Sequence, residues 1–78
     1  MQLIKCVYKN IKTGEYLRYY SINNDILCDT KLIENAKTIE FNFNPTKDNI
    51  STNKKYIIIP YNQELRIIKL KHLNEIYI

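Results

Sequence analysis

The 78-residue sequence is poor in the residues that build most catalytic and phosphate-binding sites. It has one glycine, Gly14, one histidine, His72, and no tryptophan. A single glycine cannot form the glycine-rich loops that cradle phosphates in dinucleotide- and triphosphate-binding proteins, so both patterns are excluded. Several carboxylates are present, but no spacing selects a pair of them, or a nucleophile with a base, for catalysis. We therefore expect a protein that is not an enzyme.

Cysteine is also scarce, with only Cys6 and Cys28 in the chain. Structural zinc sites use closely spaced ligand pairs, whereas a site here would need both cysteines, His72 and a fourth ligand to converge. The N-terminal residues show no signal-peptide pattern, and no segment approaches the roughly 20 apolar residues that cross a membrane. We expect a cytoplasmic protein with reduced cysteines and with no metal, cofactor or membrane contact.

The abundant residues are isoleucine, with 14 copies, asparagine and lysine, with ten each, and tyrosine, with seven. This bias is typical of A+T-rich coding, and its β-branched and aromatic components favour strands. A chain of this length has room for one domain, residues 1–78, with a modest core. The composition therefore predicts a small domain rich in β-structure.

Two alternating runs, residues 2–9 and 15–21, flank Gly14 and predict a β-hairpin in which Asn10 lies opposite Glu15. Residues 25–37 predict one short helix, and a strand over 26–28 followed by a shorter helix is the alternative. Turn formers predict an exposed loop over 44–55 and a tight turn over 61–64. Further strands are expected at 38–43, 56–60, 65–71 and 75–78.

These elements predict an α+β fold dominated by an antiparallel sheet of about five strands. A small barrel of the SH3 or OB type is the alternative, because several short strands with polar turns can also close on themselves. The run at 75–78 would form an edge strand, and a second copy of the chain could pair with it, so a homodimer fits the sequence.

The hairpin register gives the first two strands two different faces. Ile4, Cys6, Tyr8, Leu17 and Tyr19 would face inward. The opposite face would carry basic and tyrosine side chains, which can anchor a protein partner or stack on bases while cations contact phosphates. Two lysines of the strand predicted at 65–71 extend this basic character. The predicted partner-binding residues are Lys5, Lys9, Tyr16, Arg18, Tyr20, Lys69 and Lys71.

Charge is distributed unevenly along the chain, whose net charge is +4. Residues 1–20 hold four basic residues against one acidic residue, and residues 54–78 hold five against two, whereas residues 21–53 hold three against five. If the two basic ends pack together, their charges merge into one positive surface that attracts phosphate or an acidic protein patch.

In size, in A+T-rich composition and in its lack of catalytic groups, the chain resembles small phage or mobile-element proteins that inhibit a host defence complex, such as anti-CRISPR proteins. This resemblance implies a non-catalytic inhibitor and assigns no residues. The surface that we expect to dock on a protein or ribonucleoprotein complex is the basic, tyrosine-rich face derived above from the hairpin register. Two alternatives stay open: direct binding of single-stranded RNA or DNA, and a dimer that holds a small anionic nucleotide.

Overall fold

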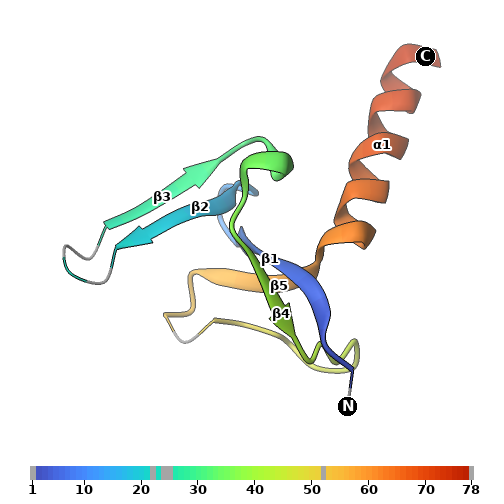
Figure 1. Cartoon of the computed structure of the whole chain (residues 1–78). Coiled ribbons are helices and arrows are strands. Elements are labelled where there is room, and N and C mark those ends of the chain that lie inside the picture. The colour runs from blue at the N-terminus through green and yellow to red at the C-terminus, as the bar shows by residue number, and fades with distance from the viewer. Residues whose placement is uncertain (1, 22, 24–25, 52, 78) are drawn as a thin grey trace.

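The computed structural model describes residues 2–21, 23, 26–51 and 53–77, with side chains described as far as residue 73. Five strands, a short 3-10 helix and one α-helix follow one another along the chain (Figure 1). In order they are β1 (Ile4–Asn10), β2 (Tyr16–Ser21), β3 (Ile26–Thr30), η1 (Ile33–Asn35), β4 (Thr38–Phe41), β5 (Tyr56–Pro60) and α1 (Tyr61–Tyr77).

Strand β1 is the centre of an antiparallel sheet, because it pairs along both of its edges. One edge pairs with β5 from Cys6↔Pro60 to Asn10↔Tyr56. The other edge pairs first with β4 and then, near its end, with β2 at Lys9↔Tyr16. Strand β3 pairs with β2, and the two form a hairpin that extends away from the rest of the sheet (Figure 1).

The expected α+β class with a sheet of about five antiparallel strands is confirmed. The register expected between β1 and β2 is confirmed only beside their loop, where Asn10 N–H donates to Glu15 O at 2.7 Å and Lys9 pairs with Tyr16. Farther along β1 the expected pairing with β2 is wrong, because Cys6 lies opposite Ile39 of β4 and Tyr19 pairs with Cys28 of β3. Gly14 has a φ of 75°, the left-handed conformation that this loop requires. The strand pairings among the described residues form a branched path without closing into a ring, so the barrel alternative is not the observed arrangement.

The helix lies elsewhere than the sequence pattern indicated. Residues 61–77, expected as a turn and two strands, form α1. Within 25–37 the observed arrangement is the alternative, a strand followed by a shorter helix, present as β3 and η1. Tyr61, Leu65 and Ile68 follow helical spacing and pack against the core formed by Val7, Tyr16 and Ile33. The C-terminal edge strand is therefore absent from the described residues, and with it the basis for the expected homodimer; residue 78 lies outside the described residues.

A β-bulge changes the faces of the second strand. The register between β2 and β3 shifts between Leu17 and Tyr19, so Arg18 is an extra residue there. An extra residue reverses the alternation that follows it, which places Leu17 and Tyr20 on the same face of the hairpin. The sequence pattern had placed Tyr20 with Tyr16, on the face opposite Leu17.

Candidate functional site

The face predicted to contact a partner is partly covered by α1. Lys9 Nζ donates to Glu64 Oε1 at 2.7 Å, and the Tyr16 hydroxyl donates to the same oxygen at 2.7 Å. Lys5 Nζ lies 4.1 Å from the centre of the Tyr61 ring, a cation–π contact. Tyr16 is only 5% exposed, so its ring is not available for stacking on a base, contrary to the expectation.

Glu64 and Tyr16 form a buried polar contact between the helix and the sheet. Burial raises the pKa of the Tyr16 phenol, and the hydrogen bond to Glu64 and the charge of that carboxylate raise it further. The phenol therefore stays protonated and donates to Glu64 over the physiological pH range. Lys9 adds an ion pair to the same carboxylate. This cluster has a structural role, because it fixes the first turn of α1 against β1 and β2.

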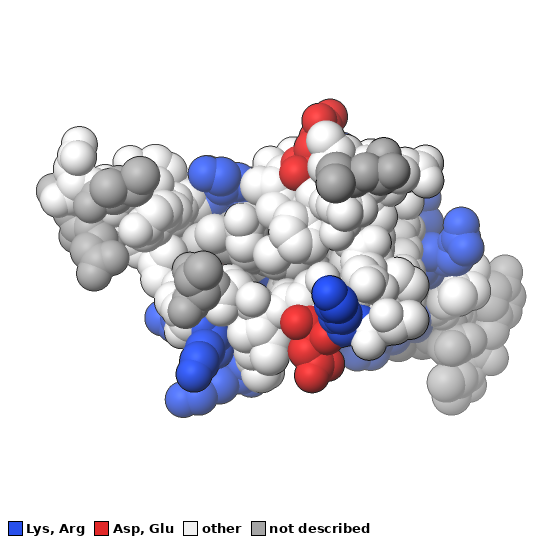
Figure 2. Space-filling model, turned by 90° about the horizontal axis from the view of Figure 1, so that it is seen from below, with Lys and Arg blue, Asp and Glu red and all other residues white. Residues whose placement is uncertain are grey.

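The other predicted residues do not gather on one surface. Arg18 is exposed at the bulge of β2, whereas Lys69 and Lys71 are exposed on α1 and do not lie on a strand. Figure 2 shows basic side chains at several separate places around a largely uncharged face, with few acidic ones. The expected merging of the two basic ends into one continuous surface is not visible on this face.

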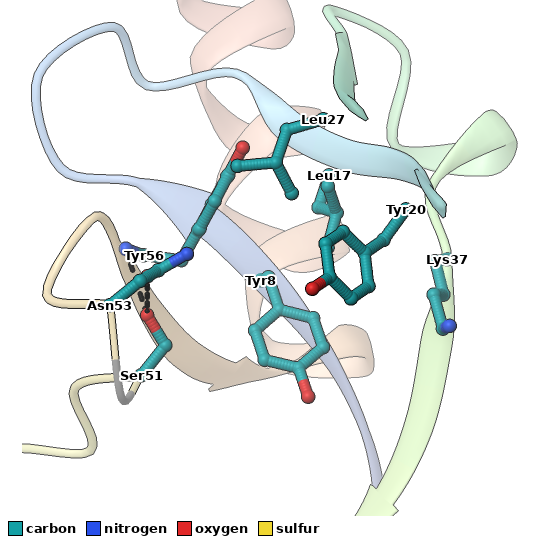
Figure 3. A pocket seen from close by; sticks show the side chains of 8 residues that line it. All are labelled: Tyr8, Leu17, Tyr20, Leu27, Lys37, Ser51, Asn53 and Tyr56. Atoms are coloured by element: carbon teal, nitrogen blue, oxygen red, sulfur yellow. Dashed lines mark hydrogen bonds between the residues drawn. The ribbon is translucent and has the colours of Figure 1, made fainter. Parts of the chain in front are cut away.

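Tyr20 instead lines a groove on the face of β1 that is opposite α1. The groove has a volume of about 280 Å³ and lies between the β2–β3 hairpin, β1, β5 and the loop before β5. Figure 3 shows the side chains of this groove around a common space. The lining residues of this tyrosine groove are Tyr8, Leu17, Tyr20, Leu27, Lys37, Ser51, Asn53 and Tyr56.

Aromatic rings and leucines form most of the groove wall. Tyr8 and Tyr56 are in edge-to-face contact, with ring centres 6.3 Å apart. Tyr20 is 41% exposed, and its ring faces the groove beside that of Tyr8 (Figure 3). Within the part of the chain that the structure describes, the hydroxyls of Tyr8 and Tyr20 make no hydrogen bond. The groove therefore combines exposed ring faces with hydroxyls that can bind a ligand.

The polar side of the groove is formed by Ser51 and Asn53, which are held in place by hydrogen bonds among Ser51 and residues 53–55. Ser51 Oγ donates to Asn53 Oδ1 at 2.6 Å, and Lys55 N–H donates to the same oxygen at 3.0 Å. Both Asn53 bonds use its oxygen, so its amide N–H groups remain to donate to a ligand. Lys37 lies at the other side of the groove (Figure 3) and has no acidic partner among the described residues.

Asn53 also lines a second hollow. It has a volume of about 330 Å³. Lys54, which lines this hollow, has a φ of 58°, in the left-handed region. Ile11 N–H donates to Lys55 O at 3.0 Å, which joins residues 53–55 to the β1–β2 loop. This second hollow, called the lysine hollow below, is lined by Ile11, Lys12, Asn53, Lys54 and Lys55.

A half-buried carboxylate, Asp29, holds the two walls of the groove together. It accepts the hydroxyl proton of Tyr56 at 2.7 Å and a bond from Asn10 Nδ2 at 3.0 Å. Burial raises the pKa of the Tyr56 phenol, and the bond to Asp29 raises it further. Because Asp29 belongs to β3, Asn10 to β1 and Tyr56 to β5, these bonds set the distance between the hairpin and β5.

Most residues of the groove and of the lysine-lined hollow were missed by the sequence analysis. Tyr8 was assigned to an inner face, and residues 44–55 were expected only to form an exposed loop. The adjacent Lys54 and Lys55 in that loop were a usable signal, since a cationic pair beside turn formers is suited to anion contact. Nothing in the sequence indicated that Lys37 lies beside Tyr20, because this placement depends on the bulge at Arg18 and on long-range strand pairing.

The remaining features show no second chemical site. Cys6 is buried and Cys28 is exposed, and they are not bonded to each other. No group of three or more His, Cys, Asp or Glu side chains lies together within the described residues. None of the described helices is long and apolar enough to cross a membrane. No protein-family model matches the chain, and neither the curated proteins nor the solved structures include a significant match to it.

Proposed function

We propose that the protein is a non-catalytic module that binds single-stranded nucleic acid through the tyrosine groove and the adjoining lysine hollow. The observation that carries this proposal is that one residue, Asn53, lines both hollows. One presents aromatic rings, the other presents three lysines, and no acidic side chain lines either. Proteins that bind single strands combine these two features, with rings stacking on bases and cations following the phosphates.

The size of the groove suits one flat ring. Pockets that enclose drug-sized ligands measure about 300–1,000 Å³, and the groove, at about 280 Å³, lies just below that range. A base can stack on Tyr20 or Tyr8 there, while the Asn53 amide donates to an oxygen or nitrogen on its edge. The adjoining phosphates then meet Lys12, Lys54 and Lys55. A base is reachable in this way only when it is unpaired, which supports a single strand over a duplex.

The test is the binding of labelled single-stranded RNA and DNA by fluorescence anisotropy over a salt series. About three phosphate contacts give a slope of log K against log salt of about −2. Replacing Tyr20 with alanine should weaken binding about 5- to 150-fold, the range for loss of one stacked base. Tyr19→Ala is the matched control, because Tyr19 is the neighbouring exposed tyrosine on the opposite face of the hairpin.

The lysine hollow is tested separately with the double variant Lys54→Ala, Lys55→Ala. It should lower affinity for every sequence alike and make the salt slope less steep by about 1.4. Lys69→Ala, on α1 and outside both hollows, should leave the slope unchanged. Absence of binding at low salt, or equal losses in the Tyr19 and Tyr20 variants, would refute the proposal.

The expectation that the chain inhibits a host defence complex stays a prediction. The face expected to dock on such a complex included Tyr16 and Lys9, which instead contact Glu64 of α1. Docking on a complex would therefore use other surfaces. Nucleic-acid binding through the groove is compatible with such a role, since the target would then be the strand held by the complex. The cytoplasmic location likewise stays a prediction.

A further inference from the structure

Beyond nucleic-acid binding, we propose that the outer face of α1 binds an acidic amphipathic helix of another protein. Only the first turns of α1 touch the sheet, and the helix then extends past it (Figure 1). On the side away from the core, Ile67, Leu70 and Leu73 are 50%, 56% and 47% exposed. Three large apolar side chains at a spacing of three residues form a stripe on one side of a helix.

The side of α1 that packs against the core through Tyr61, Leu65 and Ile68 becomes accessible where the helix extends past the sheet. Ile68 packs against the core, but together with Lys69, His72 and Leu73 it lines a hollow of about 370 Å³ on the helix surface. The turn at residues 69–73 is therefore accessible on more than one side. A partner helix can lie along the stripe and insert side chains between those of α1, as paired helices do.

The charges along the stripe select the chemistry of this partner. If Ile67 and Leu70 occupy the two core positions of a heptad, Arg66 and Lys71 occupy the flanking positions whose charges decide pairing between helices. Lys69 adds a third exposed cation, and the one acidic residue of 61–73, Glu64, is buried against Lys9 and Tyr16. A partner with carboxylates beside its own apolar stripe complements this arrangement.

A second copy of the chain is disfavoured by the same charges. Two α1 helices packed through this stripe would bring the Arg66 and Lys71 side chains of both copies to one narrow interface. Like charges at these positions destabilise a helix pair, whereas opposite charges steer and stabilise it. A nucleic-acid backbone would satisfy the cations and leave the apolar stripe exposed to water. The combination of charge and apolar area thus favours an acidic protein helix.

The test uses a synthetic peptide of three heptads with leucine at both core positions and glutamate at both flanking positions. We expect saturable binding to the full chain, measured by anisotropy of the labelled peptide. A peptide with lysine at the flanking positions is the matched control and should not bind. The variant Leu70→Ser should weaken binding of the acidic peptide at least tenfold, and Arg66→Glu with Lys71→Glu should reverse the preference between the two peptides.

Circular dichroism melts test whether α1 stays folded in each variant, and sedimentation measures the oligomeric state. The Tyr20→Ala variant should bind the acidic peptide like the wild type, so loss of nucleic-acid binding is distinguishable from loss of this contact. Failure of the acidic peptide to bind, equal binding of both peptides, or a wild-type dimer that Leu70→Ser dissociates would each overturn the proposal.

Discussion

Replacing Glu64 with alanine should weaken the whole domain, because this carboxylate joins α1 to two strands at once. The substitution leaves the Tyr16 hydroxyl without an acceptor at a position that is 5% exposed. Hydrogen bonds to charged groups contribute about 1.5–3 kcal/mol. Lys9 loses its partner as well, but its side chain is 36% exposed, so this ion pair adds less than about 1 kcal/mol.

The expected total is about 2–3 kcal/mol, out of roughly 4–12 kcal/mol for a domain of this size. This corresponds to a decrease in Tm of about 10–20 °C. Chemical denaturation measures the free energy of unfolding, and hydrogen exchange of the α1 amides shows whether the helix detaches first. Glu64→Gln is the control variant, because it keeps an oxygen acceptor for Tyr16 and should retain about half of the lost stability.

Tyr16→Phe is the second single variant of a double-mutant cycle, since it removes the donor of the same hydrogen bond. In the background of Glu64→Ala, the change at Tyr16 should cost much less than in the wild type, because the phenyl ring has no hydroxyl left to satisfy. A Glu64→Ala variant within about 0.5 kcal/mol of the wild type, the usual effect of a surface change, would show that this contact does not hold the helix.

Two further predictions concern the fold. Because the folded-state pKa of Tyr16 and Tyr56 lies above the ordinary value of 10.0, both phenols hold their protons in the folded state when the unfolded state releases them. Stability should therefore be unaffected by these groups below pH 10 and fall above it by up to about 1.4 kcal/mol per pH unit for each, a slope that urea unfolding measures and Tyr16→Phe should roughly halve. Gly14→Ala should cost about 1–2 kcal/mol in the same assay and Gly14→Asn less; equal costs would mean that the left-handed backbone is not the cause.

Local signals predicted the part of the β1–β2 hairpin that lies beside its loop. Gly14 lies between two alternating runs, and only one register keeps each set of side chains on one face, so the pairing of Lys9 with Tyr16 followed from the sequence alone. Strand β5 was predicted correctly for a similar reason, because its run of isoleucines ends at Pro60. These elements depend on turn geometry and on short-range pattern, both of which a single sequence contains.

The α-helix was missed because its pattern fits two structures. Ile67 and Ile68 favour a strand, and Lys69 and Lys71 alternate as they would on one. The helical signal was the spacing of Tyr61, Leu65 and Ile68, directly after the proline that ends β5. An apolar stripe on the outer side of α1 obscured that spacing, since apolar residues occur around most of the helix. The feature that misled the prediction is thus the one that supports the proposed docking face.

The two tyrosine–carboxylate contacts lie on different sides of the sheet, as do the two proposed binding sites. Tyr16 and Glu64 fix α1 on one face of β1, whereas Tyr56 and Asp29 join the hairpin to β5 and set the width of the groove on the other face. The contacts share no residue, and each connects elements that are distant in the sequence. Loosening α1 at Glu64 should therefore impair helix docking before it affects base binding, and loosening the groove at Asp29 should do the reverse. If both proposals hold, we expect the protein to bind a single strand and a protein partner at the same time, because neither ligand needs the surface that the other covers.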